Sequence, residues 1–100
     1  MKGVKKLDEL IKILSGHKGE MQDRFKVKSL GLFGSYVRGE QKKKSDLDVL
    51  VEFREPVGLF HFMDLEEYLE KLVGVEADLV SKRALKPRIG RHIMEEVVYV

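Results

Sequence analysis

The chain is 100 residues long, 43% hydrophobic and 36% charged, with 19 basic and 17 acidic side chains that give a formal net charge of +2. This length predicts one compact domain over residues 1–100, and the near balance of charge offers no argument for a nucleic-acid partner. The absence of cysteine excludes disulfides, thiolate metal sites and cysteine nucleophiles. Because so small a domain buries a modest fraction of its surface, we expect it to depend on a partner or a second copy.

The N-terminal segment is basic, but its apolar residues are spaced for a helix and never form a continuous run. This pattern argues against a signal peptide, and no stretch approaches the length that crosses a membrane. We therefore expect a cytoplasmic protein that makes no membrane contact.

The first half of the chain predicts a helix, a strand and a short helical turn. The first helix carries one apolar stripe at positions i, i+3, i+4 and i+7, formed by Leu7, Leu10, Ile11 and Leu14. We expect it to stop at Ser15-Gly16, with residues 17–24 as a polar connection that retains some helix. Residues 25–33 then predict a strand, residues 36–39 one helical turn, and residues 40–45 a charged loop.

The second half predicts two further strands and two helices. Residues 46–53 alternate as a strand does, with Asp46, Asp48 and Leu50 on one face. A helix closed by Gly74 follows, and its expected apolar stripe is Leu59, Phe62, Met63, Leu69, Leu72 and Val73. Residues 75–80 predict a strand. Pro87 suits the first turn of a last helix, whose apolar positions are Ile89, Ile93 and Val97, while the end of the chain is left open.

The aspartates of the central strand suggest a cation site. Asp46 and Asp48 point the same way at about 6.5–7 Å along the backbone, an arrangement that repulsion disfavours unless a cation lies between them. Carboxylate oxygens suit Mg²⁺. If the strand with Asp78 is a neighbour, three carboxylates surround one site, enough for two ions about 3.5–4 Å apart. Because Asp-x-Asp is a common tripeptide, a turn or strand entry at Asp46 with a solvent-facing Asp48 is the better explanation of the pair taken alone.

A Gly-Ser turn precedes the aspartates. Gly34 lets a phosphate approach the backbone, and the Ser35 hydroxyl with nearby amides offers donors to phosphate oxygens. The plainer alternative is a strand-to-helix turn with Ser35 as N-cap. Arg38 is a plain surface arginine by default, with two functional alternatives, reaching toward phosphate or pairing with a nearby carboxylate. Lys42–Lys44 form a loop that attracts polyanions or is simply solvated.

Taken together, the two motifs read G-S-Y-V-R-G-E-Q-K-K-K-S-D-L-D-V, with ten residues between Gly34-Ser35 and Asp46. This segment resembles the minimal nucleotidyltransferases (MNT family) of the DNA polymerase β superfamily, which are antitoxins beside HEPN-domain toxins. The resemblance extends over essentially the whole chain. Val37 departs from it, because the family more often has alanine before Arg-Gly. All three acidic positions of the family pattern are filled.

The resemblance implies an α/β (α+β) fold of the nucleotidyltransferase type, a short mixed β-sheet flanked by α-helices. It also implies transfer of AMP from ATP to a tyrosine of a cognate HEPN toxin, which makes the protein an antitoxin. By the family pattern Asp46, Asp48 and Asp78 form the catalytic and metal site with two Mg²⁺ ions, and Gly34 and Ser35 hold the triphosphate. We assign Arg38 to the nucleotide site as well. Asp78 is a candidate to help deprotonate the acceptor.

Two other readings remain at this point. The first is a catalytically silent module of the same fold that neutralises a partner by binding alone. The second is an RNA or small-molecule nucleotidyltransferase, suggested by Lys42–Lys44, although interleaved aromatics and a broad basic face are missing. Because 100 residues leave little room for an acceptor-binding domain, we expect a protein acceptor that brings its own surface. The sequence leaves homo- or hetero-oligomers open.

Overall fold

The computed structural model describes residues 6–100. Its elements in chain order are α1 (Leu7–Gly16), α2 (Lys18–Phe25), β1 (Val27–Phe33), α3 (Ser35–Arg38), β2 (Leu47–Phe53), α4 (Leu59–Val73), β3 (Ala77–Ser81), the 3₁₀ turn η1 (Lys82–Ala84), α5 (Pro87–Glu96) and β4 (Val98–Tyr99). None of the helices within residues 6–100 is long and apolar enough to cross a membrane.

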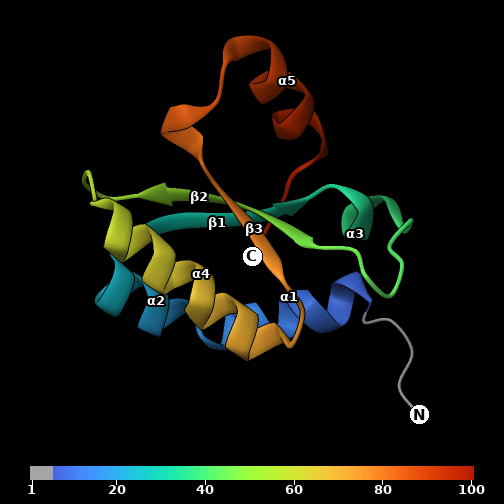
Figure 1. The fold of residues 1–100 in the computed structure, drawn as a ribbon, viewed down its shortest axis with the longest axis horizontal. Coiled ribbons are helices and arrows are strands. Elements are labelled where there is room, and N and C mark those ends of the chain that lie inside the picture. The colour runs from blue at the N-terminus through green and yellow to red at the C-terminus, as the bar shows by residue number, and fades with distance from the viewer. Residues whose placement is uncertain (1–5) are drawn as a thin grey trace.

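The strands form one four-stranded sheet in the order β3-β2-β1-β4. β2 runs parallel to β3, and β1 runs antiparallel to both β2 and β4. Figure 1 shows α1, α2 and α4 together on one side of this sheet and α5 on the other side. The expected mixed sheet flanked by helices is confirmed.

One face of the sheet carries the main core. Leu47, Val49 and Val51 of β2 are fully buried there. The helices contribute buried residues to the same cluster, among them Leu10, Leu14, Leu65, Leu69 and Val73. Because side chains alternate along a strand, Asp48 lies on the opposite face, which is the side of α5. Leu50 is also buried, although it shares the face of Asp48.

The segment between the first helix and β1 is more helical than expected. Residues 18–25 form the complete helix α2, in which Met21 and Phe25 are buried. Phe25 was expected to open the strand, but its i, i+4 spacing with Met21 places both side chains on one helix face. Lys26 then takes a left-handed conformation with φ of 60°, and β1 starts only at Val27.

Helix α4 ends at Val73, and Gly74 is its C-cap as expected, with φ of 75° and an amide N–H that donates a hydrogen bond to the Glu70 carbonyl. Its expected apolar stripe is wrong in part, because Leu59 and Met63 are 70% and 49% exposed. The buried row is Leu65, Leu69 and Val73. At about 3.6 residues per turn, Met63 falls nearly opposite Leu65 around the helix axis.

The end of the chain forms a strand that the sequence did not predict. Helix α5 begins at Pro87, as expected, but ends at Glu96, so Val97 lies beyond it, and Ile89 is 56% exposed. β4 then pairs with β1 through Gly31 and Tyr99. A side chain at Gly31 would meet Val97 Cγ2 at 2.5 Å, so glycine there admits the C-terminal segment. β3 likewise starts two residues later than expected, at Ala77.

Candidate active site

The Gly-Ser turn follows β1 and lies against the aspartate strand. Gly34 has φ of 81° and ψ of −154°, a conformation that residues with a side chain avoid, and Ser35 begins α3. The N-cap is therefore Gly34 and not Ser35. Phe33 pairs with Asp48 across the β1–β2 ladder. A Cβ on Gly34 would lie 2.0 Å from Asp48 Oδ2. Because glycine has no side chain, the Asp48 carboxylate can lie directly against the turn.

Two of the three aspartates lie side by side on neighbouring strands. In the parallel β2–β3 ladder Asp48 is the direct partner of Asp78, so the expected proximity of these strands is confirmed. Asp46 is exposed and precedes the first residue of β2, whereas the sequence placed it inside the strand. The amides of Ala77 and Leu79 donate to Glu70 and Glu66 of α4, which fixes the outer edge of β3 beside Asp78.

Negative charge accumulates at Asp48. Burial, followed by repulsion from Asp78 and Asp46, raises its pKa from 3.8 to about 6. Within residues 6–100 no three His, Asp or Glu side chains are already gathered into a metal-binding group. Mg²⁺ usually takes one or two protein carboxylates and completes its shell with water and phosphate oxygens. The donor set therefore fits Mg²⁺ held by a carboxylate pair together with a nucleotide.

Arg38 pairs with carboxylates, the second of its two expected readings. Its Nε contacts Glu40 Oε1 at 2.9 Å and its Nη1 contacts Glu96 Oε1 at 2.9 Å. The other oxygen of Glu96 accepts the Gly34 amide at 2.7 Å. These bonds hold the pKa of Glu96 below its usual value, the Gly34 bond most of all. The sequence did not single out Glu96, because nothing local marks a glutamate at the end of an amphipathic helix.

The lysine loop borders the aspartates. Lys43 and Lys44 line a surface hollow of about 480 Å³ together with Asp46, Gly74 and Glu76. The loop therefore contributes positive charge beside Asp46.

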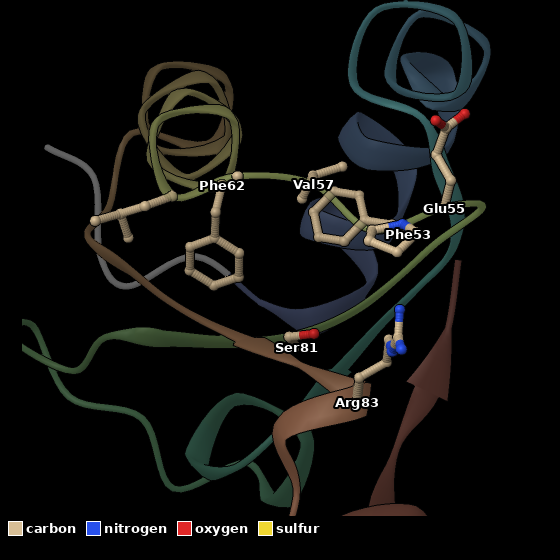
Figure 2. Close-up of a pocket in the computed structure, with 9 residues that line it drawn as sticks. Phe53, Glu55, Val57, Phe62, Ser81 and Arg83 are labelled. Atoms are coloured by element: carbon tan, nitrogen blue, oxygen red, sulfur yellow. The ribbon is translucent and has the colours of Figure 1, made fainter.

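A second, apolar hollow of about 270 Å³ lies where β2 and β3 end. Figure 2 shows Phe53, Val57 and Phe62 around it, with Ser81 and Arg83 on one side. Phe53 is five residues along β2 from Asp48, which corresponds to about 16 Å. None of the predicted site residues lines this hollow, so we do not assign it to the active site.

The mixed four-stranded sheet flanked by helices has the nucleotidyltransferase fold. The chain belongs to the nucleotidyltransferase domain family, which matches residues 14–100. It is a homologue of the protein adenylyltransferase MntA of Thermococcus cleftensis, with 52% identity over 94 residues that cover 94% of this chain and 95% of the relative.

Solved structures agree with this assignment. One described as a minimal nucleotidyltransferase superposes with a TM-score of 0.73 at 34% identity and covers 89% of this chain and 93% of its own. A toxin–antitoxin crystal structure with AMP-PNP gives 0.70 at 24% identity, covering 92% and 69%. A tri-AMPylated HEPN toxin with its MNT antitoxin from Shewanella oneidensis gives 0.59 at 20% identity, covering 92% and 66%. The last two likenesses show a shared fold alone.

Proposed function

We propose that this protein transfers AMP from ATP to a tyrosine hydroxyl of a cognate HEPN toxin and thereby silences it. The pairing of Asp48 with Asp78, beside a turn where any side chain at Gly34 would collide with Asp48, carries the proposal. The 52% identity to a protein adenylyltransferase supports AMP as the group and a protein as the acceptor. The S. oneidensis complex, in which an HEPN toxin carries three AMP groups, supports the class of partner.

In this proposal Asp46 and Asp48 hold Mg²⁺, with Asp78 completing a site for two ions. When bound, Mg²⁺ neutralises the charge that develops on the phosphate oxygens and the leaving pyrophosphate. Gly34 leaves room beside Asp48, and the Ser35 hydroxyl donates to the triphosphate. Most of the catalytic effect then comes from positioning and from charge compensation, as in phosphoryl transfer generally.

The reaction forms a bond between the acceptor oxygen and the α-phosphorus of ATP and breaks the bond from that phosphorus to pyrophosphate. The hydroxyl proton must leave the acceptor oxygen. Asp78 is exposed and is the register partner of Asp48, so an incoming acceptor hydroxyl can reach its carboxylate. We assign it as the general base. Kinetics of Asp78→Asn test the assignment, since near-normal transfer with normal Mg²⁺ binding would eliminate this role.

The direct test is incubation with labelled ATP, Mg²⁺ and the HEPN protein encoded next to this gene. We expect the label on a tyrosine of that protein, and no label with Asp46→Ala or with EDTA. If the neighbour stays unlabelled while Asp46→Ala still neutralises its toxicity, the protein acts by binding and not by transfer. We further propose that both proteins act in the cytoplasm and that they associate as a hetero-oligomer.

A further inference from the structure

We infer that Glu96 is a positioning residue of the nucleotide site. Its carboxylate fixes the segment of the Gly-Ser turn and α3, residues 34–38, by binding Gly34 at one end and Arg38 at the other. The inference rests on the proposed function, because it assigns this turn to ATP. One carboxylate oxygen accepts the Gly34 amide at 2.7 Å. The other accepts from Arg38 Nη1 at 2.9 Å, so a single side chain closes residues 34–38.

The turn needs such a clamp because its backbone is unusual. Gly34 combines φ of 81° with ψ of −154°, and α3 is only four residues long. Glycine loses more conformational freedom on ordering than any other residue, so this conformation depends on surrounding contacts. Gly34 is also buried, and a buried amide must find an acceptor. Glu96 supplies it, and the ionised carboxylate makes that bond stronger than a neutral acceptor would.

Glu96 can act as a clamp because its own backbone is anchored. It is the last residue of α5, and β4 starts two residues later. β4 pairs with β1, and the Val100 amide donates to the Leu30 carbonyl at 2.9 Å. The strand that leads into the Gly-Ser turn therefore also holds the segment that carries Glu96. Only 24% of the Glu96 side chain is exposed, compared with 48% for Arg38.

Because of these contacts, Gly34, Ser35 and Arg38 contribute to the turn in different ways. The Gly34 amide already donates to Glu96, so Gly34 contributes its backbone conformation and its lack of a side chain. The Ser35 hydroxyl then serves as the donor to phosphate. Arg38 is held between Glu96 and Glu40 by two ion pairs. A triphosphate therefore meets a preformed turn whose shape depends on a residue 62 positions away.

The test measures MgATP affinity for wild type, Glu96→Gln and Glu96→Asp. The amide of Glu96→Gln keeps the shape but loses the charge, and the shorter Glu96→Asp cannot span both partners. We expect either change to weaken MgATP binding about tenfold, the lower end of what removing an orienting partner costs. Glu95→Gln changes the exposed neighbour on the same helix and should leave affinity unchanged.

The Gly34 amide proton reports directly on its hydrogen bond to Glu96 and on whether MgATP breaks that bond, while the Tm of the same variants separates a loss of MgATP affinity from a loss of fold stability. In ¹H–¹⁵N spectra of the wild type we expect this proton at low field and protected from exchange, both before and after MgATP is added, and shifted upfield in Glu96→Gln. Unchanged MgATP affinity in folded Glu96→Gln and Glu96→Asp would overturn the inference. Tighter binding, or loss of the Gly34 protection when MgATP binds, would also overturn it, because Glu96 would then compete with phosphate. Failure of the wild type itself to bind MgATP would instead refute the proposed function and the inference with it.

Discussion

Replacing Gly34 by alanine tests whether the Gly-Ser turn and the aspartate strand form one site. The new Cβ would lie 2.0 Å from Asp48 Oδ2, 2.9 Å from its Cγ and 3.2 Å from its Cβ, so rotation of the carboxylate alone does not clear it. The backbone adds strain, because φ is 81° and ψ is −154°. We expect a conformational cost of about 1–3 kcal/mol and a steric cost of similar size.

Gly39→Ala is the matched control for this change. Gly39 also has a positive φ, 73°, but a Cβ there would meet nothing within 4 Å. Its substitution should cost about 1–2 kcal/mol of stability through the left-handed backbone alone. Against a typical folding free energy of about 5–15 kcal/mol, Gly39→Ala should stay folded. The combined cost of Gly34→Ala is about 2–6 kcal/mol, so its urea curve must show that it is folded before transfer rates are compared.

Urea denaturation and AMP transfer to the HEPN partner separate the two effects. Gly34→Ala should be less stable than Gly39→Ala. Its transfer rate should fall at least about 100-fold, since displacing a catalytic group by about 1 Å costs a factor of that size. Gly39→Ala should keep transfer within about threefold, as its stability loss leaves the site folded. Equal activity of the two variants would refute the claim that Gly34 makes room for Asp48.

Three further outcomes follow from the structure. The pKa of Asp48 is raised from 3.8 to about 6 in the folded protein. Without Mg²⁺, the free energy of unfolding relative to Asp48→Asn should therefore be greatest below pH 3.8, the pKa of the unfolded carboxyl, and should fall as the pH rises through 6. The full shift corresponds to about 3 kcal/mol, which we reduce to about 1 kcal/mol for solvent screening, and thermal melts from pH 4 to 8 measure it. Gly31→Ala should cost about 1–3 kcal/mol through contact with Val97, and adding Val97→Ala should recover part of it in a double-mutant cycle. Leu65→Ala, at a fully buried position, should cost about 2–5 kcal/mol, whereas Leu59→Ala, at one 70% exposed, should stay within about 0.5 kcal/mol in urea melts.

The sequence predicted the elements whose signals are local. The i, i+3, i+4, i+7 spacing from Leu7 gave α1, the alternation from Leu47 gave β2, and Gly74 marked the end of α4. It failed where tertiary contacts decide. Phe25 suits a strand by propensity, but its burial beside Met21 makes it the end of a helix. Val98 and Tyr99 are too few to show a period, and become a strand only because β1 offers a free edge beside Gly31.

The candidate site divides in the same way. The sequence by itself predicted the chemistry: the spacing from Gly34-Ser35 to Asp46 and Asp48, and a third acid at Asp78, led us to expect a metal and a triphosphate, because these residue types suit those ligands. Only the tertiary structure decided which groups meet. Parallel pairing of β2 with β3 places Asp48 opposite Asp78. The β4–β1 pairing anchors the segment that follows α5 and so brings Glu96 to Gly34, a contact between residues 62 positions apart that no local pattern records.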